Sequence, residues 1–177
     1  QKEGQVRIPS GCAISAVISR EGRKMTGEAI VESMRPMHDR SNGLGGGFAG
    51  YGIYPEYRDL YAFHIFFQSK ADRQACEAFL KEGFEICKAE PMPIRKIPEI
   101  TDVPLIYRYF AAPLQSVLSR LQLDEKEYVA RTVMRINREI QGAYVFSSGK
   151  NMGVFKAVGF PEDVGRFYRL DEYSGYS

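Results

Sequence analysis

The sequence predicts an α+β fold. Strand-like and helix-like patterns follow one another in the order strand, helix, strand, strand, helix, with a further helix and a hairpin near the end. Two of the strands are separated by only a short turn, which is typical of antiparallel pairing, and antiparallel strands mixed with helices favour α+β over a doubly wound parallel sheet. The chain has 177 residues, 44% of them hydrophobic, so it can bury a sizeable core.

The first predicted strand follows Cys12 directly. Apolar residues at positions 14, 16 and 18 alternate with residues 13, 15 and 17, and a period of two is the period of a strand. Cys12 would then lie at the exposed end of a buried strand, which is a common place for a reactive group. The alternative interpretation is that Cys12 is a small, buried hydrophobic residue.

A helix is predicted after the polar turn around Gly22. Thr26 can cap this helix, and its apolar positions recur at helical spacing: Ile30, Val31, Met34 and Met37. Pro36 should bend or shorten the last turn. Strands are predicted next over residues 48–54 and 60–68, and we expect them to be neighbours in one antiparallel sheet.

The middle of the chain predicts a helix over residues 71–81, an extended piece over residues 84–89 and a strand over residues 105–112. Cys76 falls on the apolar side of the helix, and Cys87 lies inside the extended piece. We interpret both as core thiols.

The strongest helix signal begins at Asp124. Asp124 and Glu127 have the spacing of a capping box, and Gly142 is placed to end the helix. The residues expected to be buried between them are Val129, Val133, Ile136 and Ile140. Residues 143–148 and 152–158 then flank Gly149-Lys150-Asn151 and predict a hairpin, and a short helix is expected from Pro161 toward Phe167.

Composition excludes several classes of function. A formal net charge of +2 is too close to neutral to indicate nucleic-acid binding. The sequence has no apolar segment of the roughly 20 residues that a membrane-spanning helix needs and no secretory signal, so we expect a cytoplasmic protein without a membrane partner. Three cysteines without a C-x-x-C pair, and two histidines, suggest neither a disulfide framework nor a metal site.

Two glycine motifs are interpreted as structural. The run Gly45-Gly46-Gly47-Phe48-Ala49-Gly50 satisfies G-x-G-x-x-G, but the residues after it, 51–55, do not predict the helix that a dinucleotide site requires. Asn42-Gly43 is expected to form a turn.

Three segments carry a resemblance to a known family. They are Gly11-Cys12-Ala13-Ile14, the run Met34-Arg35-Pro36-Met37-His38-Asp39-Arg40-Ser41-Asn42-Gly43-Leu44-Gly45-Gly46-Gly47, and the pair of segments 144–151 and 155–156. Together they resemble class II glutamine amidotransferase domains, above all the glutaminase domain of archaeal-type glutamate synthases, from about Pro9 to the end of the chain. The resemblance implies the four-layer αββα sandwich of N-terminal-nucleophile hydrolases.

The resemblance also implies a chemistry, the hydrolysis of the glutamine amide by Cys12. In such enzymes the cysteine is the first residue, and its own α-amino group, with a pKa of about 7.7–8.0, takes the thiol proton. Residues 1–11 would therefore be a leader that must be removed at the Gly11–Cys12 bond. Arg40 matches an arginine that helps to hold the surroundings of the nucleophile, although the family usually has His-Arg-Gly where this chain has Asp39-Arg40-Ser41. The alternative for Arg40 is a surface arginine favoured by a helix C-terminus.

The family's glutamine-binding and oxyanion motifs have no match before Ser177, so residues 12–177 are expected to be the N-terminal portion of the glutaminase domain and poorly active alone. The family's oxyanion Asn-Gly pair follows a histidine well downstream, so that role is not transferred to Asn42-Gly43. No substrate-binding residue is assigned. No cofactor is expected in this domain, because flavin and iron–sulfur centres belong to the partner synthase domain or subunit.

Two hypotheses of different class follow from the sequence. The first is the glutaminase part of a glutamate synthase-like enzyme, with glutamine as substrate and a synthase domain or subunit as partner. The second is a non-catalytic, truncated or unprocessed interaction subunit that keeps Cys12 acylated. In either case an incompletely covered sheet predicts self-association or a marginally folded chain.

Overall fold

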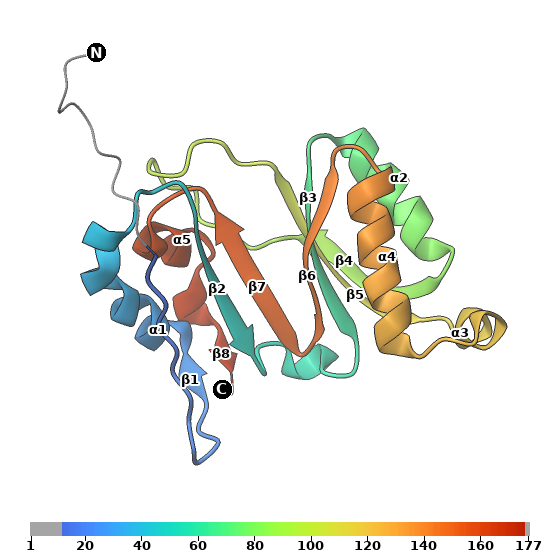
Figure 1. Cartoon of the computed structure of the whole chain (residues 1–177), viewed down its shortest axis with the longest axis horizontal. Coiled ribbons are helices and arrows are strands. Elements are labelled where there is room, and N and C mark those ends of the chain that lie inside the picture. Colours follow the sequence, from blue (N-terminus) through green and yellow to red (C-terminus); the bar gives the residue numbers. More distant parts are fainter. Residues whose placement is uncertain (1–11, 176–177) are drawn as a thin grey trace. The chain divides into compact units, whose positions relative to one another are not determined.

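The computed structural model describes residues 12–175, so the leader expected over residues 1–11 lies outside it. The described chain forms two compact units. The first, here called the terminal unit, lies within Gln1–Gly50, Pro93–Asp102 and Phe155–Ser177, and the second, the central unit, comprises Tyr51–Met92 and Val103–Val154. The strands are antiparallel wherever their register is defined and are combined with helices (Figure 1), which confirms the α+β class.

The central unit is built on a four-stranded sheet with the strand order β4-β5-β3-β6. The strands are β3 (Tyr61–Phe67), β4 (Phe84–Pro91), β5 (Leu105–Pro113) and β6 (Ala143–Lys150). Strand β3 pairs along its whole length with β5 on one side and β6 on the other, with an irregularity between His64 and Ile65. An inner strand covered on both faces reads as a continuous apolar run, and six of the seven residues of β3 are buried.

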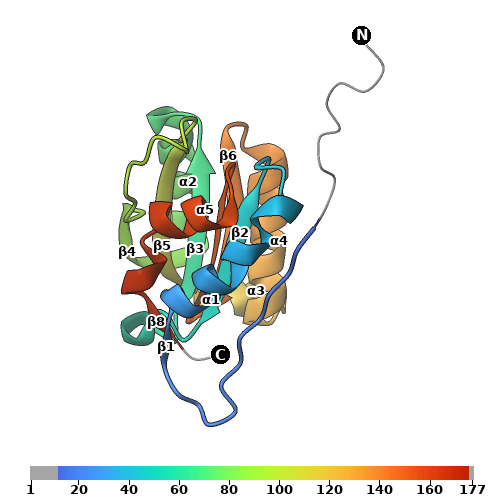
Figure 2. The ribbon, with the colours of Figure 1, turned by 90° about the vertical axis from the view of Figure 1, so that its left-hand side faces the viewer.

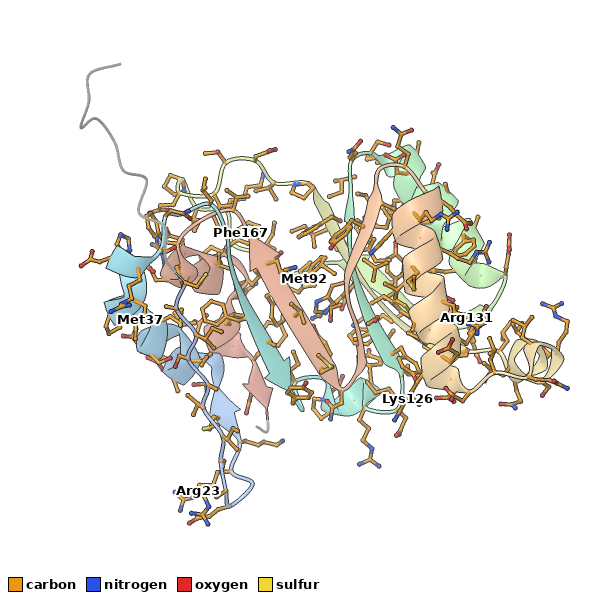
Figure 3. The ribbon with its side chains drawn as sticks, in the orientation of Figure 1. Arg23, Met37, Met92, Lys126, Arg131 and Phe167 are labelled. Carbon is orange, nitrogen blue, oxygen red and sulfur yellow. The ribbon has the colours of Figure 1, made fainter. Side chains whose placement is uncertain are left out.

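Helices α2 (Lys70–Lys81), α3 (Gln115–Leu121) and α4 (Glu125–Glu139) complete this unit. Asp124 caps α4 as the sequence predicts, because its side chain accepts a hydrogen bond from the amide of Glu127 at 2.8 Å. On the exposed side of α4, Arg131 pairs with Glu127 one turn earlier at 2.7 Å; Arg131 is labelled in Figure 3. Helix α3 was not predicted.

The core of the central unit lies between this sheet and the apolar faces of α2 and α4. The fully buried side chains that meet there come from both layers: Phe63, Ile65, Cys76, Leu80, Tyr109 and Ile136. Asn137 fixes α4 to β6, since its amide group donates to the carbonyl oxygen of Val145 at 3.1 Å and accepts from the amide of Val145 at 2.7 Å. Burial of the apolar side chains, at roughly 1.5–3 kcal/mol each, is the main stabilising term.

The terminal unit contains α1 (Gly27–Met34), the 3-10 helix η1 (Arg35–Arg40), α5 (Pro161–Phe167) and the 3-10 turn η3 (Leu170–Glu172). Two short strands, β1 (Met25–Thr26) and β8 (Ser174–Gly175), pair antiparallel. The predicted effect of Pro36 is confirmed, because the α-helix ends at Met34 and continues as a 3-10 helix. Figure 2 shows α1 and α5 side by side.

Two predicted strand pairings are wrong. Strand β2 (Gly46–Tyr51) pairs with β7 (Met152–Ala157) in a separate two-stranded sheet, not with β3, whose two edges are already occupied. Strands β6 and β7 belong to different sheets, so they do not form the predicted hairpin. Asn151 adopts a left-handed conformation between them, and its backbone oxygen and side-chain oxygen accept hydrogen bonds from the amides of Gly52 and Tyr54 at 2.6 and 2.9 Å. A short 3-10 turn, η2 (Pro55–Tyr57), leads from this region to β3.

Candidate functional site

Cys12 is exposed to solvent, so the interpretation of this thiol as a small buried residue is wrong. The predicted strand after it is also absent, because residues 12–19 form no backbone ladder with any described strand. Side-chain exposure in this segment nevertheless alternates from one residue to the next, as the sequence pattern does. Residues 13, 15 and 17 are half-buried, whereas Ile14 and Ile18 face solvent with 91% and 74% of their surface exposed.

The segment after Cys12 is held on helix α1 by serine side chains. The hydroxyl oxygens of Ser15 and Ser33 are 2.8 Å apart, and the Ser33 hydroxyl also lies 2.7 Å from the carbonyl oxygen of Ile30. Because Ser15 is three residues from Cys12, this contact restrains the segment that carries the thiol. Sequence reasoning did not identify it, since a single serine on a helix carries no pattern of its own.

Arg40 is the last residue of η1 and is exposed. Within the described part of the chain, no hydrogen bond or ion pair connects its guanidinium group with Cys12. Asn42-Gly43 forms the expected turn: the amide of Leu44 donates to Asn42 Oδ1 at 3.0 Å, and Gly43 has a φ of 71°. The glycine run that follows continues from Gly45 into strand β2, and residues 51–54 after it form no helix, as predicted.

The other two cysteines differ from each other. Cys76 is fully buried under the sheet, as expected, and burial raises the pKa of its thiol to about 12. Such a thiol is inert at neutral pH. The interpretation of Cys87 as a core thiol is wrong, because it lies on the exposed side of the outer strand β4. Over residues 12–175, no cluster of three or more His, Cys, Asp or Glu side chains could hold a metal ion.

The two histidines have separate partners. His64, on β3, is fully buried, with Nδ1 2.7 Å from the carbonyl oxygen of Val154 and Nε2 2.8 Å from the hydroxyl of Tyr54. Burial is the main reason why its pKa is lowered to about 4. His38, on η1 next to the labelled Met37 of Figure 3, places Nδ1 2.5 Å from Glu162 Oε1. Its ring stacks on Phe160 with the centroids 4.0 Å apart.

The terminal unit also has an open cleft of about 490 Å³ beside α1 and α5. Charged side chains dominate its lining, three of them arginines and four of them carboxylates: Arg35, Arg95, Arg166, Glu28, Glu32, Glu162 and Asp171. Val31 and Gly165 complete the lining. Sequence reasoning could not find this cleft, since its members come from three segments far apart in the chain.

Comparison with known proteins adds one relative. No model of a known protein family matches the chain. An uncharacterized protein of the archaeon Archaeoglobus fulgidus is 45% identical over 168 residues, an alignment that covers 93% of this chain. The chain spans only 44% of that protein, so it corresponds to less than half of the relative. Over residues 12–175, no helix is both long and apolar enough to cross a membrane.

Proposed function

We propose that the chain is part of a class II glutamine amidotransferase, the glutaminase of a glutamate synthase-like enzyme, and that Cys12 is its nucleophile. The observation that carries the proposal is the exposure of Cys12, which lies in the first of the segments that carry the resemblance. Of the other two thiols, Cys76 is buried with a raised pKa, and Cys87 is exposed on the outer strand β4, outside those segments. A nucleophilic cysteine must be accessible and must reach the thiolate form. The α+β fold with antiparallel sheets and helices is compatible with the αββα sandwich that the proposal requires.

The proposed reaction uses the amine of the same residue. The α-amino group of a processed Cys12 accepts the thiol proton, and the thiolate attacks the carboxamide carbon of glutamine. The C–N bond breaks, the nitrogen takes the proton back and leaves as ammonia, and a thioester remains on Cys12. Water then attacks the thioester, which releases glutamate and restores the thiol. Ammonia passes to a synthase domain or subunit, where we place the flavin and iron–sulfur chemistry.

The surroundings of the histidines support an amine as the base. His64 is buried and bonded to Tyr54 and Val154, and His38 is bonded to Glu162. Over the described residues, no hydrogen bond brings either imidazole to Cys12. A thiol without an imidazole partner needs another base with a pKa near neutrality, and an α-amino group has one. In this proposal Arg40 is a positioning residue.

A specific observation favours the second candidate, a non-catalytic interaction subunit. Ile14 and Ile18 are exposed in the segment that follows Cys12, and exposed apolar side chains that gather on one surface are a feature of interaction sites. In this alternative the bond between Gly11 and Cys12 stays intact. The two candidate functions therefore differ in whether the α-amino group of Cys12 is free or part of a peptide bond.

Labelling with 6-diazo-5-oxo-norleucine, an electrophile that mimics glutamine, tests the assignment of the nucleophile. In the full-length protein processed to begin at Cys12, we expect peptide mass mapping to place the label on Cys12 alone. Iodoacetamide is the control, since it should also modify the exposed Cys87, and the Cys12→Ser variant should lose the glutamine-analogue label. Labelling at Cys87 or Cys76 by the analogue would refute the assignment.

A further inference from the structure

We infer that the cleft of the terminal unit is a binding site for an α-amino acid with a cationic side chain. The cleft is formed by α1 and the first residue of η1, by α5 and η3, and by Arg95 of the segment 93–102. Its volume of about 490 Å³ is in the range of small-ligand sites. This inference does not rest on the proposed amidotransferase activity.

A glycine allows the two helices to approach closely at the floor of the cleft. Gly165 on α5 faces Val31 on α1, and a Cβ atom at position 165 would lie 2.6 Å from a Val31 methyl carbon. A larger residue at this position would therefore push the two helices apart. The two residues leave a small apolar floor, against which a short aliphatic stem can pack.

One wall of the cleft follows a stripe of α1 that continues into η1. Glu28 and Glu32 of α1 and Arg35, the first residue of η1, recur at intervals of four and three residues, so they lie on the same side over roughly 10 Å. Asp171 lies at the Glu28 end, because the preceding residues, Gly27 and Leu170, are in backbone contact.

The charges in the cleft are unequally satisfied. Arg35 pairs with Glu32 at 2.7 Å, and Arg166 pairs with Asp163 at 2.6 Å. Arg95 reaches only to 3.8 Å from Glu172, which is already bonded to Arg169 at 2.7 Å. One guanidinium group therefore remains available to a carboxylate ligand.

Two carboxylate groups of the cleft are available to cations, and a third is only partly satisfied. In the described part of the chain, Glu28 and Asp171 make no ion pair. Glu162 uses Oε1 for His38, and its Oε2 is buried without a hydrogen-bond partner among the described residues. Glu162 nevertheless lines the cleft, so its negative charge would attract a cation there. The cleft thus offers one available guanidinium group, two carboxylates without an ion pair, and the carboxylate of Glu162, whose partner is His38.

The charged groups of the cleft complement those of a basic amino acid. Its α-carboxylate would bind Arg95, its α-ammonium group would bind Glu28 and Asp171 at the same end, and its side-chain cation would lie toward Glu162. The aliphatic stem between the two cations would cross the floor formed by Val31 and Gly165. An acidic amino acid would bring a second carboxylate into a cleft with surplus negative charge.

Isothermal titration calorimetry of the protein with L-lysine, L-arginine and L-glutamate tests the inference. We expect L-lysine or L-arginine to bind with a dissociation constant of about 1 mM or lower and L-glutamate to bind at least about tenfold more weakly. The Glu28→Gln/Asp171→Asn variant and the Arg95→Gln variant should each weaken binding of the basic amino acid by about tenfold or more.

Matched controls lie outside the cleft. Glu21→Gln removes an exposed carboxylate of the same unit and Lys96→Gln removes the cation next to Arg95, and both variants should bind like the parent. Far-UV circular dichroism shows whether each variant is folded. The inference is overturned if neither basic amino acid binds, if L-glutamate binds as tightly, or if folded cleft variants bind like the parent.

Discussion

Lowering the pH from 7.5 to 4.5 should destabilise the protein through His64. The ring is held between two partners: Nδ1–H donates to the carbonyl oxygen of Val154, and Nε2 accepts from the hydroxyl of Tyr54. Only the neutral ring can make both bonds, since a protonated imidazole has no acceptor nitrogen. Burial opposes the charged ring and, with a smaller contribution from the positive charge of Arg108, lowers the pKa to about 4.

The size of the effect follows from the difference between the two pKa values. In the unfolded chain the pKa of His64 is its ordinary value of about 6.5, so the unfolded state takes up a proton first as the pH falls. The contribution of His64 to folding is therefore fully present above pH 6.5 and is lost as the pH falls from about 6.5 to about 4. The free energy of unfolding should decrease by about 2 kcal/mol by pH 5, and by about 3 kcal/mol in total.

Urea unfolding followed by circular dichroism at several pH values measures this loss. Carboxylates also titrate in this range, so the informative quantity is the difference between the parent and the His64→Gln variant, whose amide side chain can donate and accept without a charge. The parent should lose about 2 kcal/mol more than the variant between pH 7.5 and pH 5. Equal losses in the two proteins, or an NMR titration of His64 with a pKa near 6.5, would refute the reasoning.

Two further predictions concern the packing around His64 and self-association through exposed apolar side chains. Gly153→Ala should destabilise the protein by about 1–3 kcal/mol in urea unfolding, because its Cβ would lie 2.6 Å from Cε1 of His64; Gly45→Ala, where a Cβ meets nothing within 4 Å, is the control and should change stability little. Replacing Ile14 and Ile18 with serine should reduce self-association in sedimentation velocity, whereas the control Met134→Ser, at an exposed position of α4, should not. A parent protein that sediments as a strict monomer would contradict the second prediction.

Local patterns predicted the elements of this fold better than their pairing. The cap at Asp124 and the apolar runs of β3 and β5 are encoded within a few residues, and the structure confirms them. Pairing depends on which edges are free. Strand β2 resembles a neighbour of β3 in sequence, but β5 and β6 occupy both edges of β3, so β2 pairs with β7 instead. A hairpin was predicted at Gly149-Lys150-Asn151. Instead, Asn151 adopts a left-handed conformation, and the chain passes there from the four-stranded sheet to the two-stranded sheet.

At the candidate site, too, local features could be predicted from the sequence and contacts between distant segments could not. The chemical type of Cys12 and its alternating segment were visible in the sequence, and the exposure of the thiol agrees with them. The prediction of a strand directly after Cys12 was wrong, because no described strand pairs with residues 12–19. The pair of His38 and Glu162 joins residues 124 positions apart, and no local pattern indicates it.

The proposal that Cys12 acts with its own amine is tested most directly by the rate of its modification by 6-diazo-5-oxo-norleucine in two forms of the full-length protein. One form begins at Cys12, and the other retains residues 1–11, so that the amine is part of a peptide bond and cannot accept a proton. The amine-as-base mechanism predicts fast labelling of Cys12 in the first form, increasing with pH through the range of an α-amino group, about 7.7–8.0, and a sharp fall in the second. Equal rates in the two forms would contradict it.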